Sequence, residues 1–114
     1  MSVYTITVPP SANKLYRNAT ARDNAKGRIK TAAYKRWRDL AAWELKLQRN
    51  GQETMTGPVA LSITLRRPHP LSDLSNIVKP TEDALQSAGV FKNDRQVSHL
   101  TAAWADHDGC RVTV

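Results

Sequence analysis

Acids, amides and one lysine are regularly spaced in the second half of this 114-residue chain. The segment that begins at Asp73 includes Asn76 and Lys79, and Asn93 and Asp94 follow it. Carboxylate and amide oxygens suit a hard divalent ion, and a lysine can neutralise charge that develops on a phosphate. The chain also carries a formal net charge of +7. The pattern therefore predicts metal-assisted hydrolysis of a phosphodiester in nucleic acid.

A helix should present these polar side chains on one face. A projection at about 100° per residue places Asn76, Lys79 and Asp83 opposite an apolar face, and that apolar face comprises Leu74, Ile77, Val78, Thr81, Leu85 and Ala88. We expect Ser72 to cap the helix and Pro80 to kink or restart it, because proline lacks a backbone N–H.

An amphipathic helix with a merely solvated charged face would show the same pattern. The pair Asn93-Asp94 favours a site instead, because it lies between a helix stop at Gly89 and a strand pattern that starts at Val97. Acids at a helix start and at a loop edge can converge in space.

This region resembles the RusA-like Holliday junction resolvases of bacteria and their prophages. The family pattern reads approximately Asp-x-Asp-Asn-x-x-Lys-x-x-x-Asp-Ala-Leu, then Gly, then Asp-Asp-x-Gln-Val. The matching residues are Asp73, Asn76, Lys79, Asp83, Ala84, Leu85, Gly89, Asp94, Gln96 and Val97. The opening, with Pro9-Pro10-Ser11-Ala12-Asn13 followed by Tyr16-Arg17, resembles the first strand and turn of the family.

The resemblance implies a magnesium-dependent endonuclease that binds a four-way DNA junction as a homodimer. By the resemblance, Asp73 and Asp94 hold the metal and Lys79 supports catalysis, with Asp83 supporting Lys79 from one turn away. Manganese would suit the same oxygen ligands. A two-fold protein presents two equivalent sites, as cutting two symmetry-related strands requires.

Two positions depart from the family pattern. Ser75 stands where the second aspartate would be, and Asn93 replaces the first acid of the Asp-Asp pair. Together with Asn76 they offer neutral oxygens as further candidate ligands, without the negative charge that holds an ion. A cleavage-impaired junction-binding protein is therefore a second hypothesis.

Positive charge is concentrated near the start of the chain. Nine Lys or Arg residues and only one acid lie between positions 14 and 38, whereas six of the ten acids lie from position 73 onward. Such a basic arm suits a phosphate backbone, and the candidate DNA contacts are Asn13, Lys14, Arg17, Arg66 and Arg67. A basic, non-catalytic interaction module is the third hypothesis.

Length and composition predict one domain over residues 1–114 and exclude several classes of protein. No apolar run is long enough to span a membrane, so we expect a cytoplasmic protein, and the family resemblance implies that a bacterium or phage encodes it. The single Cys110 cannot form an internal disulfide and is expected to pack in the last strand. The segment Asp106-His107-Asp108 is better explained as a turn than as a metal site.

Alternating periodicities predict an α+β fold in the order β-α-β-α-β-β, with a mixed sheet covered by helices. We expect strands at 3–8 and 59–65, a helix at 31–49, and a closing hairpin of 97–105 with 111–114. Residues 18–30 are interpreted as a flexible loop. Within the helix, a broad apolar stripe is expected, formed by Ala33, Tyr34, Trp37, Leu40, Ala41 and Leu47. Trp43 lies at the margin of that stripe, where it would cover the core or meet a second subunit. Glu44 projects near the centre of that stripe, for which the sequence offers no reason.

Overall fold

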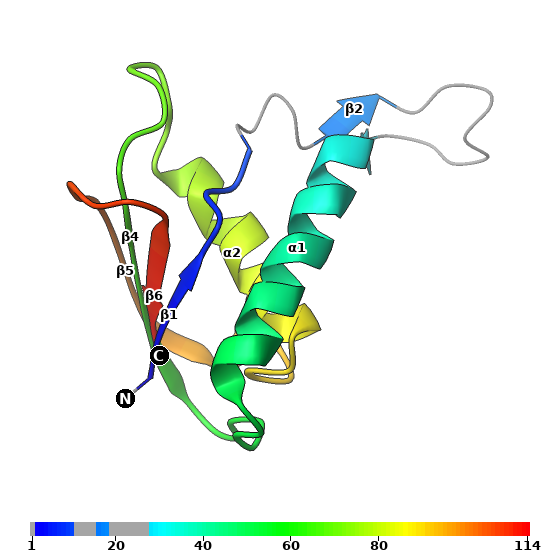
Figure 1. Cartoon of the computed structure of the whole chain (residues 1–114), viewed down its shortest axis with the longest axis vertical. Coiled ribbons are helices and arrows are strands. Elements are labelled where there is room, and N and C mark those ends of the chain that lie inside the picture. The colour runs from blue at the N-terminus through cyan, green and yellow to red at the C-terminus, as the bar shows by residue number, and fades with distance from the viewer. Residues whose placement is uncertain (1, 11–15, 19–27) are drawn as a thin grey trace.

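A computed structural model describes residues 2–10, 16–18 and 28–114, with backbone alone at 16–18 and 28–30. The elements in chain order are β1 (Val3–Ile6), β2 (Tyr16–Asn18), β3 (Arg28–Lys30), α1 (Ala32–Arg49), β4 (Val59–Leu65), α2 (Ser75–Ser87), the 3-10 helix η3 (Asp94–Gln96), β5 (Val97–Trp104) and β6 (Cys110–Thr113). Four strands form one mixed sheet, and α1 and α2 lie on the same side of it (Figure 1). The predicted α+β fold is confirmed, with the small β2–β3 ribbon as an addition.

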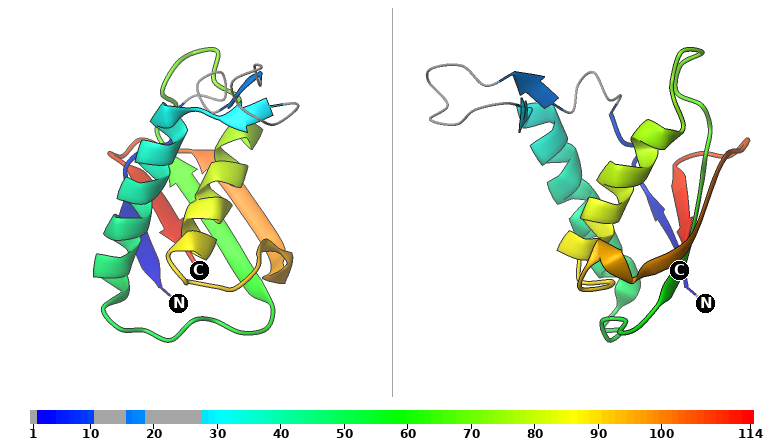
Figure 2. Two further views of the ribbon diagram at one scale, coloured as in Figure 1. Left: turned by 90° about the vertical axis from the view of Figure 1, so that its right-hand side faces the viewer. Right: turned by 180° about the vertical axis from the view of Figure 1, so that it is seen from behind.

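Strand β4 lies inside the sheet and provides much of the core. Its side chains alternate as the sequence predicts, so that Val59, Leu61, Ile63 and Leu65 are buried beneath the helices while Ala60 is exposed on the other face. Branched apolar side chains at every second position fit a pleated strand with one covered face. The views in Figure 2 show that both helices cover this one face and leave the opposite face open.

The predicted closing hairpin is wrong. The sheet order is β1-β6-β4-β5, so β4 separates β5 from β6. β5 pairs parallel with β4, whereas β6 pairs antiparallel with both β4 and β1. The turn signal at Asp108-Gly109 is correct as a turn, but the chain there crosses over the end of β4. Insertion of β6 buries Cys110 and Val112 in the core.

Helix α1 covers the boundaries predicted for it, and Tyr34, Trp37 and Ala41 of the predicted apolar stripe are buried. Its N-cap is Thr31, whose hydroxyl accepts from the Tyr34 amide at 3.1 Å. The buried side chains of α1 are Tyr34, Trp37, Ala41, Ala42 and Leu45. The core positions expected for Trp43, Leu40 and Leu47 are wrong, since these side chains are 59%, 43% and 60% exposed. The buried face follows Tyr34, Trp37 and Leu45, which turns Trp43 toward solvent.

Side chains of α1 cap the outer edge of β1, which explains Glu44. Gln48 accepts from the Thr5 amide at 2.8 Å and donates to the Thr5 carbonyl at 2.7 Å. Glu44 accepts from the Thr7 amide at 2.9 Å, and the Trp37 indole donates to the Thr7 carbonyl at 2.8 Å. Helix α1 therefore supplies the hydrogen bonds that a further strand would make.

Only the two ends of the predicted loop at 18–30 lie within the described residues. Its two ends belong to an antiparallel ribbon in which Asn18 pairs with Arg28, so those ends are ordered backbone rather than loop. Residues 19–27 lie outside the described part of the chain. Within the described part, no helix is long and apolar enough to cross a membrane.

Candidate active site on helix α2

Helix α2 carries the predicted polar face but begins later than predicted. It starts at Ser75 without a side-chain cap, so the predicted cap at Ser72 is wrong; the Ser72 amide bonds instead to the His69 carbonyl in a preceding turn. Of the two alternatives at Pro80, a fresh helix start is wrong, since α2 runs through this residue; a kink stays a prediction. The carbonyl that loses its partner to proline belongs to Asn76, an exposed residue near the helix start where water can replace the bond.

Lys79 lies between two carboxylates. Its ammonium is 3.1 Å from Oδ1 of Asp83, one turn further along α2, and 2.9 Å from Oδ2 of Asp94 in η3. The lysine side chain is 58% exposed, and those of Asp83 and Asp94 are 19% and 34% exposed. The structure thus brings together three of the predicted site residues at the surface of the domain.

A short capped turn places Asp94 beside α2. Asn93 is the N-cap of η3, and its side-chain oxygen accepts from the Arg95 amide at 2.9 Å. Gln96 completes a capping box by accepting from the Asn93 amide at 3.1 Å. The Asp94 amide donates to the Gln86 side chain of α2 at 3.3 Å. The asparagine that replaces a family acid is therefore used to hold this turn together.

The acid ahead of α2 lies apart from this cluster. Asp73 is exposed, and its carbonyl accepts from the Asn76 amide at 3.2 Å in the turn before the helix. Ser75, the first residue of α2, precedes Lys79 by about 6 Å along the helix axis at a rise of 1.5 Å per residue, and Asp73 comes two residues before Ser75. Among the described residues, no hydrogen bond or ion pair joins the side chains of Asp73, Ser75 or Asn76 to Lys79 or Asp94.

Hydrogen bonds and burial shift the pKa values in this cluster. Hydrogen bonds to Asp94 and then to Asp83 raise the pKa of Lys79 above its usual value, so the ammonium stays charged at neutral pH. The same bond to Lys79 lowers the pKa of Asp94. Burial raises the pKa of Glu82, and the negative charge of Asp94 raises it further. Negative charge therefore accumulates on this side of α2, with one lysine to balance it.

The sequence did not single out two members of the site. Tyr34 of α1 is buried, and its hydroxyl donates to Oδ2 of Asp83 at 2.8 Å. Glu82 is half-buried next to the cluster. Tyr34 appeared only as one apolar position of a helix, and a partner 49 residues away leaves no local signal. Glu82 could have been noticed in the sequence because it lies next to Asp83 in the acidic segment.

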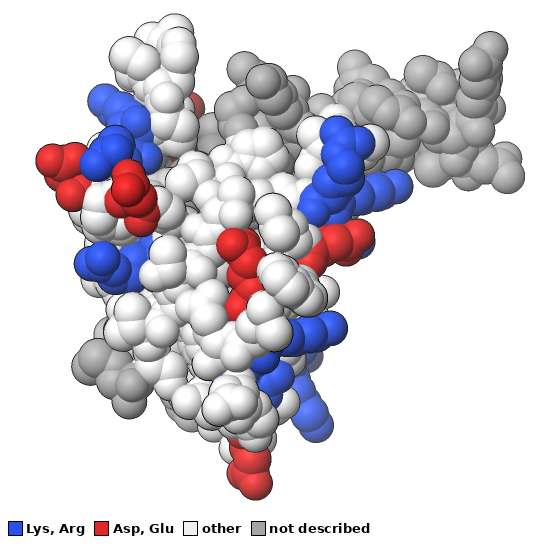
Figure 3. All heavy atoms as spheres, viewed as in Figure 1, with Lys and Arg blue, Asp and Glu red and all other residues white. Residues whose placement is uncertain are grey.

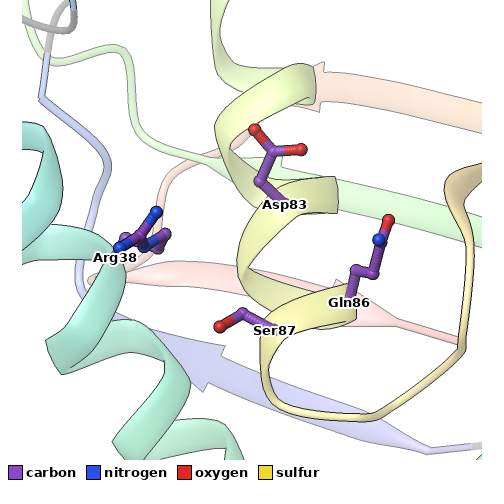
Figure 4. A pocket seen from close by; sticks show the side chains of 4 residues that line it. All are labelled: Arg38, Asp83, Gln86 and Ser87. Atoms are coloured by element: carbon purple, nitrogen blue, oxygen red, sulfur yellow. The ribbon is translucent and has the colours of Figure 1, made fainter. Parts of the chain in front are cut away.

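An open pocket of about 250 Å³ adjoins the cluster between the two helices. Arg38 of α1 and Asp83, Gln86 and Ser87 of α2 line it. Figure 4 shows Arg38 on α1 and the other three side chains on α2, where Gln86 and Ser87 are neighbours one turn beyond Asp83. An arginine of α1 and a carboxylate of α2 therefore line the same pocket.

The predicted DNA contacts lie in different surroundings. Arg66 is bound to Asp106 at 2.9 Å and to Asp108 at 3.2 Å, and the Arg67 guanidinium lies 5.2 Å from the centre of the Trp104 ring. Blue and red side chains accordingly alternate at the upper left of Figure 3, whereas Lys and Arg gather over α1 on its right-hand side. Asn13, Lys14 and the side chain of Arg17 lie outside the described residues.

The oxygen donors suit a hard divalent ion in kind, and they are spread out. Mg²⁺ usually takes one or two protein carboxylates together with water and substrate phosphate, and exposed Asp73 and Asp94 offer that chemistry. In residues 2–10, 16–18 and 28–114, no group of three or more His, Cys, Asp or Glu side chains could hold a metal ion. Asp73 and Asp94 therefore offer the kind of oxygen that Mg²⁺ takes, without forming a closed protein cage in the described part of the chain.

Comparison with known proteins identifies the class and then the family. The fold and the site define a small basic α+β domain with a lysine between two carboxylates at its surface. Residues 7–114 match the family model of the endodeoxyribonuclease RusA, so the chain belongs to the RusA family. This family comprises Holliday junction endonucleases that act on branched DNA and generally depend on a divalent metal. A search of curated proteins gave no match.

Proposed function

We propose that this protein is a magnesium-dependent, structure-specific endodeoxyribonuclease that resolves four-way DNA junctions in recombination and repair. The observation that carries the proposal is Lys79, held within 3.1 Å of both Asp83 and Asp94 inside a domain of the RusA family. Such a lysine can face a phosphate only if it remains charged, and its two carboxylate partners ensure that. A bacterial or phage-infected cytoplasm is the compartment we propose for it.

The chain's own residues would bind the metal and balance charge on the phosphate. Asp73 and Asp94 are the proposed metal ligands, with Ser75, Asn76 and Asn93 as further oxygen donors. When bound, Mg²⁺ or Mn²⁺ supplies Lewis-acid polarisation of the phosphate and lowers the pKa of water. The Lys79 ammonium would neutralise charge on the phosphate or the leaving oxygen, and Asp83 would keep it in place.

The pKa shifts of Lys79 and Asp94 determine the pH range over which their ion pair is stable. Because the pKa of Asp94 is lowered on folding, its stabilising contribution is present above its usual value and is lost as the pH falls through the lowered pKa. The pKa of Lys79 is raised, so its contribution is lost only as the pH rises through the raised value. The ion pair therefore stays intact over the neutral range in which a nuclease of this family would work.

Contacts with the phosphate backbone would come from basic residues around the site. We propose Asn13, Lys14 and Arg17 of the basic arm, together with Arg66 and Arg67. Arg66 would first have to leave Asp106 and Asp108, so Arg67 is the more available of the two. Each phosphate contact releases counterions, and junction binding should therefore weaken steeply as salt rises.

Cleavage of a labelled four-way junction beside a linear duplex tests the proposal. With Mg²⁺, we expect paired symmetric cuts confined to the junction, and at least about a 100-fold loss in the Lys79→Ala and Asp94→Asn variants. Glu53→Gln, which neutralises an exposed acid elsewhere, is the matched control and should cut at the wild-type rate. Equal binding of junction and duplex, with no dependence on Asp73 or Asp94, would support a basic interaction module instead.

A cleavage-impaired junction-binding protein is the second candidate, and the state of Asn93 favours it. The side-chain oxygen of Asn93 already accepts from the Arg95 amide, and Ser75 carries no charge where the family has an acid. In this case Ser75→Asp should raise cleavage at least about tenfold while junction affinity changes little. Ser87→Asp adds the same charge at the other end of α2 and should leave cleavage low. If wild-type protein already cuts and Ser75→Asp adds nothing, this candidate is wrong.

We also propose that the protein is a homodimer formed through β5. This strand pairs with β4 on one side, and no described strand pairs with its other side. Its eight residues include no charged residue, Pro or Gly, the usual protections of a free edge. A two-fold axis near Leu100 would pair β5 with its own copy in antiparallel fashion, and this contact is self-complementary.

Opposite charges on β5 test the dimer. Leu100→Lys and Leu100→Glu should each sediment as monomers, and an equimolar mixture should recover a dimer because unlike charges then face each other. Leu47→Lys alters a similarly exposed leucine on α1 and should leave the dimer intact. A wild-type monomer at all concentrations, or dissociation by Leu47→Lys alone, would exclude the β5 interface.

A further inference from the structure

A buried phenol on α1 contacts the proposed active site from beneath. The Tyr34 side chain is fully buried, and its hydroxyl donates to Oδ2 of Asp83 at 2.8 Å. The Trp37 ring packs edge-on against it, with centroids 6.2 Å apart and planes at 83°. A buried tyrosine needs a partner for its hydroxyl. Here that partner is a carboxylate, so the bond has a charged acceptor.

The two oxygens of Asp83 have separate partners. Oδ2 accepts from Tyr34, and Oδ1 binds the Lys79 ammonium at 3.1 Å. The same ammonium donates to Oδ2 of Asp94 at 2.9 Å. A continuous series of hydrogen bonds therefore runs from the core side of α1, across α2, to η3.

Without Tyr34, the pair on α2 would be weakly ordered. A lysine and an aspartate four residues apart on a solvated helix stabilise it only weakly, so both side chains sample several rotamers. The phenol is fixed by its burial and directs one oxygen of Asp83, which leaves the other oxygen facing Lys79. A hydrogen bond with a charged partner is also stronger than a neutral one. Tyr34 therefore limits where the lysine ammonium rests.

We propose that Tyr34 is a positioning residue for the nuclease reaction, which acts by orienting Asp83 so that Lys79 is directed at Asp94 and the phosphate bound beside it. Tyr34 touches neither DNA nor metal in this role. The inference rests on the proposed function of Lys79, and it extends the site to a second helix that the family motif does not include.

Tyr34→Phe removes the hydroxyl and keeps the ring. In the full-length protein, we expect the single-turnover rate of junction cleavage to fall about tenfold, the equivalent of one charge-assisted hydrogen bond, with junction affinity changed less than about twofold. The matched control is Tyr4→Phe, because Tyr4 is also buried and its hydroxyl donates to Gln52 at 3.0 Å far from Lys79 along the chain. That control should cut at the wild-type rate. Equal losses in both variants would overturn the proposal.

A double-mutant cycle identifies the route of the effect. Asp83→Asn should slow cleavage by itself, and adding Tyr34→Phe to Asp83→Asn should produce no further loss. Two losses that multiply would mean that Tyr34 acts other than through Asp83, and the proposal would be wrong.

The mobility of the Lys79 ammonium gives a readout that needs no cleavage. Nitrogen NMR relaxation of the lysine NH₃⁺ groups should show a lower order parameter for Lys79 in Tyr34→Phe than in wild type or Tyr4→Phe. An unchanged order parameter would overturn the positioning role. Absence of junction cleavage by the wild-type protein would overturn the proposed function alone, and the Lys79 signal would still decide the role of Tyr34.

Discussion

The two edges of the four-stranded sheet are treated in opposite ways. At β1, side chains of α1 bond to the amide and carbonyl groups of both Thr5 and Thr7. At β5, a longer strand has no described strand on its outer side and carries no charge, Pro or Gly along eight residues. Free edges invite pairing with another strand, and proteins usually block them. The same chain thus closes one edge with a helix and leaves the other open, which indicates where association is permitted.

The largest effect should come from the close approach of a turn to β1. Gly109 has φ +72°, and an added Cβ would lie 2.9 Å from Thr5 Cγ2 and 3.3 Å from the Ile6 carbonyl. Gly57 has a similar φ of +79° with open space around it. We expect Gly57→Ala to destabilise by about 1–2 kcal/mol through backbone strain, and Gly109→Ala by at least about 1 kcal/mol more through overpacking. Urea unfolding measures both, and equal losses would show that the turn does not press on β1.

Removing the cap of the closed edge should have the next largest effect. Gln48→Ala leaves the Thr5 amide and carbonyl without their α1 partners, and we expect a loss of about 1–2 kcal/mol in the free energy of unfolding. Lys46→Ala is the control, since Lys46 is exposed on the same helix and should change stability by less than about 0.5 kcal/mol. If the two variants unfold at the same urea concentration, water replaces Gln48 at no cost and the edge is not closed by it.

Hydrogen exchange should distinguish the edges without any mutation. The Thr5 and Thr7 amides bond to α1 within one chain, so their protection should not depend on protein concentration. Outward amides of β5 should be protected only in the dimer and should exchange faster on dilution. Protection of β5 that persists in a dilute monomer would mean that this edge is covered within the chain.

The smallest effect is expected in the rate at which a thiol reagent labels Cys110. Burial raises the pKa of its thiol to about 11, and the reactive form is the thiolate. The residue pairs with Ile6 on β1 and Leu65 on β4, so labelling at pH 8 should require the closed side of the sheet to open. We expect Gln48→Ala to accelerate the reaction of Cys110 with a thiol reagent, and Leu100→Lys to leave it unchanged. Acceleration by both would indicate global rather than local opening.

Local sequence patterns predicted where the helices and strands lie, but they did not predict which elements pair or pack with one another. β4 was predicted at its observed boundaries because period-two alternation is a property of consecutive residues. The hairpin prediction failed because Asp108-Gly109 specifies a turn but not which strand lies beside β6. The core position for Trp43 failed because this residue lies at the margin of the apolar stripe, and packing buried the side of the stripe with Tyr34, Trp37 and Ala41 together with Leu45.

The site residues divide in the same way, into those that local spacing predicts and those that depend on contacts between elements. The Lys79–Asp83 pair was readable from an i,i+4 spacing, and the family motif pointed to Asp94. The bond from Tyr34 to Asp83 joins two helices, so no spacing rule could reveal it. Glu44 looked misplaced in an apolar stripe because its partner, the Thr7 amide, belongs to another element.

The place of β6 in the sheet has a consequence for how the protein is made. β6 comes after all the other described strands in the chain, yet it lies between β1 and β4 and pairs with both. During synthesis from the N-terminus, β1 therefore has no strand partner until Cys110–Thr113 have left the ribosome. Helix α1 can meet β1 earlier through Gln48 and Glu44, and would hold that strand in place for a neighbour that is translated after it.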